Sequence, residues 1–416
     1  MAILSKFLES VCFKLSLSVF LIFCAVIFTA ILYVQPTLLV WASKYPDSWI
    51  LPFSNYLSMF IRWLVDGADL GFFTFKEATR AIGAVLDAPT LFLKGLLVTG
   101  FKFETESEIL FTIPPIAWFG ITSIIVLLST TLGDRRLTLF VLVSFLYVAF
   151  IGLWESTMLT IASIIVAVVL GLVNGLLLGI VAFKWPLMDR ILTPTFDFMQ
   201  TMPVFAYLVP ALMLFGYGPA AAMIITLIYA MPPMARVTKL ALTQVDQETV
   251  EFGKMVGCSS WQLIWKVMTP SIRPNIMVGV NQVIMLTLNM VIIASLIGAG
   301  GLGFDVWQAL KALRIGQGAE AGIAITLVAI VLDRISQSYA KRRPVHREDN
   351  ISFFGRHRIL IFIFGIAIGT IFVGYWMPSI SKVPDAWTFS TGRFWDNIID
   401  WININMYHYI DEFRRF

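Results

Sequence analysis

The chain has 416 residues, of which 58% are hydrophobic and only 13% carry a charge. Soluble domains average about 25% charged residues, so this composition excludes a soluble globular fold and indicates a membrane protein. The net charge is a modest +4, and the basic residues concentrate in short loops, as they do in the cytoplasmic loops of membrane proteins. Binding to nucleic acid is therefore not needed to explain the positive net charge.

The apolar runs predict about nine membrane spans in an all-α helical bundle. Lys6 and Lys14 precede the first run and place the N-terminus in the cytoplasm, as an uncleaved anchor. The long section that follows is then external, and its amphipathic patches 53–65 and 81–98 are expected to lie along the membrane. The alternation of basic loops makes the C-terminus external. The predicted spans are 15–34, 113–132, 137–153, 158–182, 191–215, 220–235, 275–297, 318–335 and 359–378.

These spans group into four predicted parts. An anchor with its outer amphipathic segment (1–112) is followed by additional spans (113–150) and a core (151–340). The last part (341–416) holds a basic loop, a further span and an outer amphipathic tail.

A short sequence recurs near the two ends of the chain. Pro46-Asp47-Ser48-Trp49 follows the first span, Pro384-Asp385-Ala386-Trp387 follows the last, and an amphipathic segment comes after each. Either two outward spans share an interfacial motif, or the chain has a tandem architecture and stops early in its second copy.

Residues 244–274, QVDQETVEFGKMVGCSSWQLIWKVMTPSIRP, predict an amphipathic helix–turn–helix whose halves are too short to cross a bilayer. Gly257 supplies the backbone freedom that a helix end needs. Ser259 with Gln262 predicts a capping box that opens a second helix, which is expected to stop at Pro270. Such a rigid element is suited to pressing into another protein.

The spacing from Glu251 through Gly257 and Val267 to Pro270 resembles the EAA loop of ABC-importer permeases. Phe252 and Gly253 stand where that family has two alanines, and Thr269 stands where it has leucine. Segments 200–218, 229–242 and 279–303 are similar to permeases that import glycine betaine, proline betaine and related osmolytes. The resemblance covers about residues 150–340.

This resemblance implies a type I ABC-importer permease core in the C-terminal half of the chain, in a bacterial inner membrane. The permease would be catalytically silent and hold no cofactor or metal, with ATP and Mg bound by separate cytoplasmic ATPase subunits. A second permease copy or a tandem-type partner would face it, and a periplasmic or lipid-anchored binding protein would dock outside, near 216–219 and 298–312. The implied ATPase-coupling residues, within 244–270, are Glu248, Glu251, Gly257, Ser259, Trp261, Val267 and Pro270.

Polar residues inside spans mark the candidate pathway, because they are costly in a bilayer. Asn281, Met285 and Asn289 recur every four residues and form one stripe on a helix. The stripe either makes helix–helix hydrogen bonds or lines a path for a zwitterion. Aromatic or sulfur contacts to a trimethylammonium group would add to that lining. The full candidate set is Gln200, Met202, Phe205, Tyr207, Asn281, Met285 and Asn289.

The main alternative function is an ion-coupled secondary transporter of a small zwitterion, which would need an ionisable residue in mid-span. Asp, Glu, Lys and Arg are predicted only at span ends, which argues against it. The glycine-rich run 298–303 matches a dinucleotide-binding pattern, but no strand is predicted before it, so a tight turn is expected. The sequence does not separate glycine betaine from choline, proline betaine or trimethylamine N-oxide.

Overall fold

The computed structural model describes residues 52–68, 73–105, 108–341 and 358–415, together with scattered residues between 19 and 29. The chain divides into two units, 1–64 and 65–416. The predicted first span lies largely outside the described residues, and Pro46–Trp49 lies wholly outside them. In the first unit, helix α3 (Phe53–Arg62) occupies the first predicted amphipathic patch and leaves Tyr56 and Met59 exposed.

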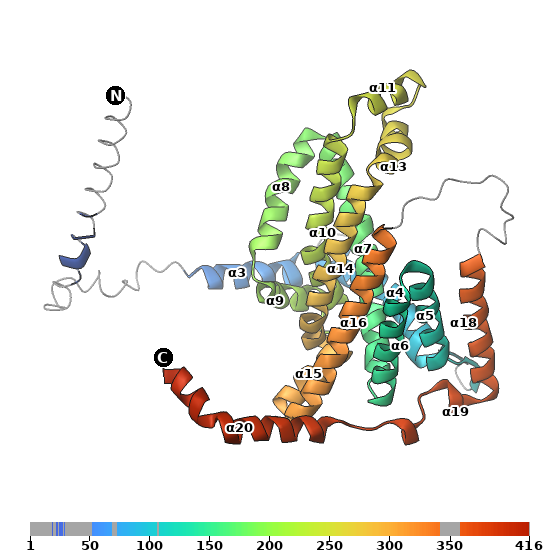
Figure 1. Cartoon of the computed structure of the whole chain (residues 1–416). Helices are drawn as coiled ribbons and strands as arrows, with labels where there is room; N and C mark the ends of the chain where they lie inside the picture. The colour runs from blue at the N-terminus through green and yellow to red at the C-terminus, as the bar shows by residue number, and fades with distance from the viewer. Residues whose placement is uncertain are drawn as a thin grey trace, which may run out of the picture. The chain divides into compact units, whose positions relative to one another are not determined.

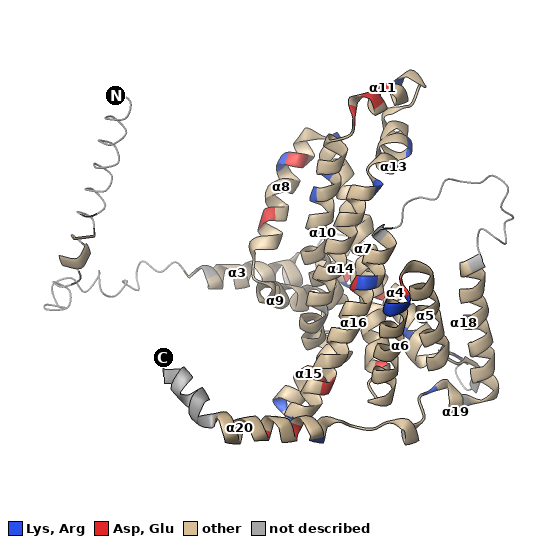
Figure 2. Ribbon diagram, viewed as in Figure 1, with Lys and Arg blue, Asp and Glu red and all other residues tan. Residues whose placement is uncertain are grey.

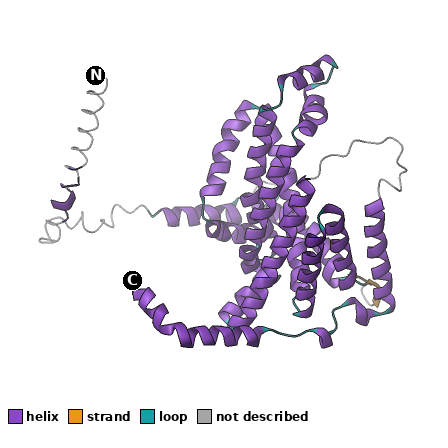
Figure 3. Cartoon of the chain, in the orientation of Figure 1, coloured by secondary structure: helices purple, strands orange, loops and turns teal. Residues whose placement is uncertain are grey.

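The second unit is a bundle of helices with one short hairpin (Figures 1 and 3). The hairpin pairs β1 (Phe101–Thr105) with β2 (Glu108–Ile113) in antiparallel register. The principal helices are α4 (Phe75–Lys94, continued by η3, Gly95–Thr99), α5 (Trp118–Leu132), α6 (Arg135–Phe150), α7 (Trp154–Lys184), α8 (Pro186–Thr201), α9 (Val204–Phe215), α10 (Pro219–Thr243), α14 (Arg273–Ala294, continued by η5, Ser295–Ala299), α15 (Leu302–Lys311), α16 (Ile315–Lys341), α18 (Arg358–Trp376), α19 (Pro378–Ser381) and α20 (Gly392–Arg415).

The all-α transmembrane class is confirmed, but the count of nine spans is not. Among the described residues, six helices are long and apolar enough to cross a membrane, and a bent pair could supply a seventh span. Helix α5 is apolar but has only 15 residues, and α6 has 16. Both are shorter than the roughly 20 residues that a perpendicular span requires.

The predicted span 191–215 is bent sharply in the structure, because α8 and α9 meet at an angle of 106°. The break falls at Met202-Pro203, where Met202 is extended with φ −67° and ψ 136°. A proline pushes the residue before it out of the helical region, which ends α8 at Thr201. Two ion pairs join α8 to α10: Asp197 with Arg236 at 2.6 Å, and Asp189 with Lys239.

Helix α4 covers most of the second patch that was expected to lie along the membrane surface, and its position relative to the membrane stays a prediction. With η3 it forms 25 residues that are long and apolar enough to cross. Its Leu86 and Leu93 pack against Val166 and Met223 of α7 and α10. Asp87 lies in mid-helix, and one of its carboxylate oxygens is buried without a hydrogen-bond partner among the described residues.

The centre of the bundle is the close packing of α7 against α10 and α14. Gly171, Gly175 and Gly179 recur every four residues and share one face of α7. A Cβ at Gly175 would lie 2.6 Å from the Cβ of Met234, and one at Gly179 would lie 2.6 Å from the carbonyl oxygen of Ala235. Small residues let helix backbones approach in this way inside membranes.

The C-terminal segment packs on the end of the bundle opposite α11 (Gln247–Met255), as Figure 1 shows. The ring of Trp387 meets Trp118 edge to face at 6.3 Å, and the Phe389 amide donates to the Phe150 carbonyl. The Gly316 amide, at the start of α16, donates to Asp396 of α20. The second copy of the recurring Pro-Asp-x-Trp sequence thus anchors the amphipathic tail to the bundle.

Candidate functional site

The predicted coupling loop (residues 244–272, called the coupling loop below) begins with the amphipathic helix that the sequence predicts. Helix α11 ends at Met255, and Gly257 has φ +83°, the left-handed region that glycine tolerates best. The Cys258 amide donates to the Gly253 carbonyl and the Gly257 amide to the Lys254 carbonyl. These two bonds form a Schellman motif, so the predicted role of Gly257 as a helix end is confirmed.

The second half of the loop opens as predicted and ends differently. The Gln262 amide donates to the Ser259 hydroxyl and the Ser259 amide donates to Gln262 Oε1, completing the capping box. Helix α12 (Ser260–Gln262) then continues as the π-helical η4 (Leu263–Met268) and α13 (Thr269–Ser271). The predicted stop at Pro270 is wrong. Pro270 lies near the start of α13, where its missing N–H costs little, and only Ile272 interrupts the path into α14.

A buried apolar cluster ties the loop to the spanning helices. Ile264, Met268 and Ile272 of the loop pack with Ile180 of α7 and Leu242 of α10, all buried. Burying one such side chain stabilises by about 1.5–3 kcal/mol, so the loop is a firmly attached part of the bundle. The loop thus shares buried contacts with both α7 and α10.

Trp261 is fixed within the chain. Its ring meets that of Trp185 at 6.1 Å, and Lys184 Nζ lies 3.8 Å from its centre. Such a cation–π contact contributes about 0.5–1 kcal/mol at an exposed site. The tryptophan thus holds the second half of the loop against the end of α7, while the other face of the loop stays open.

The open face of the loop is apolar at its tip and acidic along α11. Met255 is 80% exposed, Val256 67% and Phe252 62%. Glu248 and Glu251 are exposed, and Glu251 accepts a hydrogen bond from Gln247 in the same helix. Figure 2 shows acidic residues on α11 and few charges on the middle of the bundle helices. Exposed apolar groups at a loop tip indicate a binding surface.

Gly253 is a site residue that the sequence analysis missed. It is buried where α11 crosses the second half of the loop, and a Cβ there would lie 2.4 Å from Leu263 Cδ1 and 3.4 Å from Val267 Cγ2. Val267, one of the predicted coupling residues, therefore packs against the backbone of α11. Around Gly257, by contrast, a Cβ would have no neighbour within 4 Å. The tight contact in the loop is at Gly253, in the register position where the resembling family has alanine.

Three of the predicted pathway residues come together in one groove. Gln200, Met285 and Asn289 line an open groove of about 480 Å³ between α8, α10 and α14. Arg236 and Gln282 also line this groove. Met285 is 56% exposed, so the groove opens on the surface of this single chain.

Asn281, the first residue of the predicted stripe, has a different role. Its Oδ1 accepts a 2.7 Å hydrogen bond from the Ser336 hydroxyl, which joins α14 to α16. It is absent from the lining of the groove. The two interpretations of the stripe thus apply to different members: Asn281 packs helices together, whereas Asn289 faces the groove.

The other predicted pathway residues lie at the α8–α9 elbow and do not line the groove. The Tyr207 hydroxyl donates to the carbonyl oxygens of Met199, at 3.0 Å, and Phe198, at 3.3 Å. These carbonyls belong to the last turn of α8. The Phe198 carbonyl also accepts from the Met202 amide, whereas the Met199 carbonyl has no helical donor because residue 203 is a proline. Tyr207 therefore stabilises the elbow, at which Met202 is half-buried, and Phe205 is 60% exposed.

The glycine-rich run forms a tight turn between η5 and α15, as expected. Gly298, Gly300 and Gly301 have positive φ of 98°, 70° and 82°. The Ser295 hydroxyl donates to the Gly300 carbonyl, and the Leu302 amide donates to the Thr160 hydroxyl of α7. A helix precedes this turn, so it lacks the strand–turn–helix context of a dinucleotide site.

Residues 171–342 match the protein family described as "Binding-protein-dependent transport system inner membrane component". The chain is 36% identical to the trimethylamine N-oxide transport system permease protein TmoV of Ruegeria pomeroyi over 360 residues, which cover 86% of this chain and 53% of that protein. It is 36% identical to the glycine betaine transport system permease protein OpuAB of Bacillus subtilis over 288 residues, or 69% of this chain and 94% of that protein. Against the glycine betaine/proline betaine permease ProW of Escherichia coli, identity is 33%, covering 70% of this chain and 77% of that protein. The chain thus spans about half the length of TmoV and most of OpuAB.

Proposed function

The chain belongs to the family of binding-protein-dependent transport system inner membrane components, and we propose that it is the permease subunit of an ATP-driven importer. The observation that carries this proposal is the coupling loop. It presents exposed Phe252, Met255 and Val256 to a partner, while Ile264, Met268 and Ile272 bury it against the spanning helices. ATPase subunits that close on ATP would press on this surface and move α7 and α10.

The proposed cargo is a small osmolyte with a methylated, positively charged nitrogen, such as glycine betaine. Permeases named for trimethylamine N-oxide and for glycine betaine are similar to this chain to the same degree, 36%. A cargo of this kind has a large dipole and needs polar groups along its path. The groove with Gln200, Gln282 and Asn289 supplies uncharged polar groups, and the apolar walls of Met285 and Leu286 suit the methyl groups.

In this proposal the coupling loop is cytoplasmic, and a second permease faces the groove across the path. ATP and Mg are bound by the ATPase subunits, and a binding protein docks at the opposite end of the bundle, near 216–219 and 298–312. The family supports ion coupling less well than ATP coupling, because its members serve binding-protein-dependent systems.

Cysteine labelling tests the docking surface and the orientation together. In a variant with Cys12, Cys24 and Cys258 replaced by serine, Met255→Cys should react with an impermeant thiol reagent only after lysis. Phe389→Cys, which is 58% exposed in the wild type, should react in intact cells. Bound ATPase should protect position 255 and leave position 389 unchanged. Labelling of Met255→Cys in intact cells, or no protection by the ATPase, would contradict the proposal.

The groove is tested by a matched pair of substitutions. Asn289→Leu should slow uptake about tenfold with unchanged thermal stability, since a hydrogen bond to a charged cargo contributes about 1.5–3 kcal/mol. Asn281→Leu, which leaves the Ser336 hydroxyl without its partner, should lower the free energy of unfolding by about 1–3 kcal/mol. Uptake assays and thermal unfolding of the purified protein measure the two effects. Normal uptake by the Asn289→Leu protein would show that this groove is not part of the transport pathway.

A further inference from the structure

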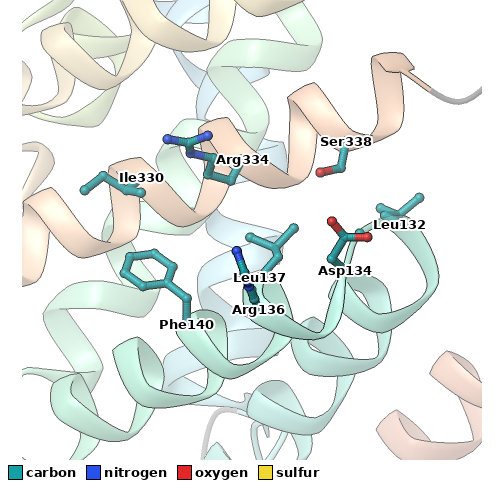
Figure 4. Close-up of a pocket in the computed structure, with 9 residues that line it drawn as sticks. Leu132, Asp134, Arg136, Leu137, Phe140, Ile330, Arg334 and Ser338 are labelled. Atoms are coloured by element: carbon teal, nitrogen blue, oxygen red, sulfur yellow. The ribbon is translucent and has the colours of Figure 1, made fainter.

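A second pocket, of about 660 Å³, opens between the start of α6 and the last third of α16, away from the groove. Figure 4 shows Arg136 of α6 and Arg334 of α16 on the two facing helices. Phe140 and Ile330 lie toward one end of the pocket, and Asp134, Ser338 and Leu132 lie toward the other. Two guanidinium groups from distant parts of the sequence therefore flank one open space.

Neither arginine is neutralised within the part of the chain that the structure describes. The ion pairs found there join Arg236 to Asp197, Lys239 to Asp189 and Lys382 to Glu155. Asp134 also lines the pocket, but it makes no salt bridge with either arginine. The three charges sum to +1, which one phosphodiester anion would balance. Bidentate contacts to a phosphate are the geometry that guanidinium groups favour.

The start of α6 adds to this preference for an anion. Asp134 occupies the N-cap position but makes no side-chain capping bond, so the first-turn amides of α6 keep their unsatisfied donors. The helix has 16 residues, and its positive dipole end adjoins Arg136. The N-terminal end of α6 and the two arginines thus both favour a negatively charged ligand.

The pocket lies toward the end of the bundle that carries the coupling loop, although the loop itself extends farther (Figure 1). α14 starts directly after the loop and α16 runs back toward it, and the Ser336–Asn281 hydrogen bond joins the two helices near that end. Arg334 and Ser338 flank Ser336 in sequence. Phe140 and Ile330 lie one turn deeper than Arg136 and Arg334 along their helices, toward the middle of the bundle, and provide an apolar wall below the charges.

We propose that this pocket binds an anionic phospholipid, with its phosphodiester between Arg136 and Arg334 and the start of an acyl chain along Phe140 and Ile330. Asp134, at the other end, accepts a hydrogen bond from a headgroup hydroxyl, as a phosphatidylglycerol headgroup can donate. Basic pockets between spanning helices hold anionic headgroups in this way. A free inorganic anion would use the arginines but gain nothing from the apolar wall. The assignment to the inner leaflet rests on the proposed orientation, whereas the binding itself does not.

The test is native mass spectrometry of the full chain released from nanodiscs of equimolar phosphatidylglycerol and phosphatidylcholine. The double variant Arg136→Gln/Arg334→Gln should lose phosphatidylglycerol adducts roughly tenfold or more. The single variant Arg136→Gln should lose part of them. The control Arg135→Gln removes the same single charge one residue away, from a side chain that does not line the pocket, and should keep them. Both arginines are exposed, so their replacement leaves the fold intact.

Three outcomes would overturn the proposal. If the double variant keeps as many phosphatidylglycerol adducts as the wild type, the arginines do not bind the lipid. If Arg135→Gln loses as many adducts as the pocket variants, the effect is one of overall charge and not of this pocket. Displacement of the lipid by millimolar inorganic phosphate would identify a site for small anions. Because these measurements need neither ATPase nor transport, they stand apart from the test of the proposed function.

Discussion

Replacing Gly253 with leucine is expected to abolish transport while the spans still insert and assemble. Even a Cβ at this position would lie 2.4 Å from Leu263 Cδ1, and leucine adds three further carbons between α11 and the second half of the loop. Overpacking of this kind costs about 1–3 kcal/mol and is relieved by displacing one element. α11 makes few buried contacts, so it should move, carrying Phe252 and Met255 away from their positions on the proposed docking surface.

A graded series tests this explanation. Gly253→Ala should retain most activity, because the close atom is the end of the Leu263 side chain, which can rotate away. The transport activity of Gly257→Val should lie between those of Gly253→Ala and Gly253→Leu. No atom lies within 4 Å of a Cβ there, but its φ of +83° adds strain of about 1–2 kcal/mol. ATP hydrolysis stimulated by the cargo is measured in reconstituted vesicles, with co-purification of the ATPase as the assembly control. Full stimulation of the Gly253→Leu protein would mean that the loop does not transmit the ATPase motion.

Replacing Gly175 with leucine is expected to destroy the bundle itself. A Cβ at Gly175 would meet the Met234 side chain at 2.6 Å and the Met231 carbonyl oxygen at 3.0 Å. Backbone cannot rotate away as a side chain can, so α7 and α10 would have to separate along their length. Because α10 leads directly into the coupling loop, the groove and the loop should be lost together.

The matched control is Gly369→Leu in α18, where a Cβ has no neighbour within 4 Å and the position is exposed. Both substitutions add the same apolar atoms to an apolar helix, so they differ only in the space available. Size-exclusion chromatography and thermal unfolding of the purified chain should show a folded Gly369→Leu protein and an aggregated or strongly destabilised Gly175→Leu protein. Wild-type stability for Gly175→Leu would contradict the close α7–α10 packing.

Features that depend on neighbours in the sequence could be predicted from the sequence. The Ser259–Gln262 capping box and the helix end at Gly257 involve bonds within five residues, so residue type and spacing decide them. The general positions of most long helices followed from apolar runs for the same reason. The bend at Met202-Pro203 was also encoded locally, but the continuous apolar run across it favoured a straight span.

Features that depend on distant residues could not be predicted in this way. Asn281 and Asn289 share one helix stripe, and what separates them is the hydroxyl of Ser336, 55 residues away. Gly253 is critical because Leu263 and Val267 fold back on it, and glycine by itself indicates only a flexible or small position. Arg136 and Arg334 meet at one pocket although 198 positions separate them, which no periodicity within a single helix can reveal.

Uptake into vesicles tests the central proposal most directly. The chain is reconstituted with its ATPase and binding protein, and uptake of labelled glycine betaine and trimethylamine N-oxide is followed with ionophores present to collapse all ion gradients. We expect uptake of at least one of them that requires ATP on the side of the coupling loop and stops when the ATPase is omitted. Uptake that continues without ATPase, driven by a sodium or proton gradient, would contradict the assignment as an ATP-driven permease.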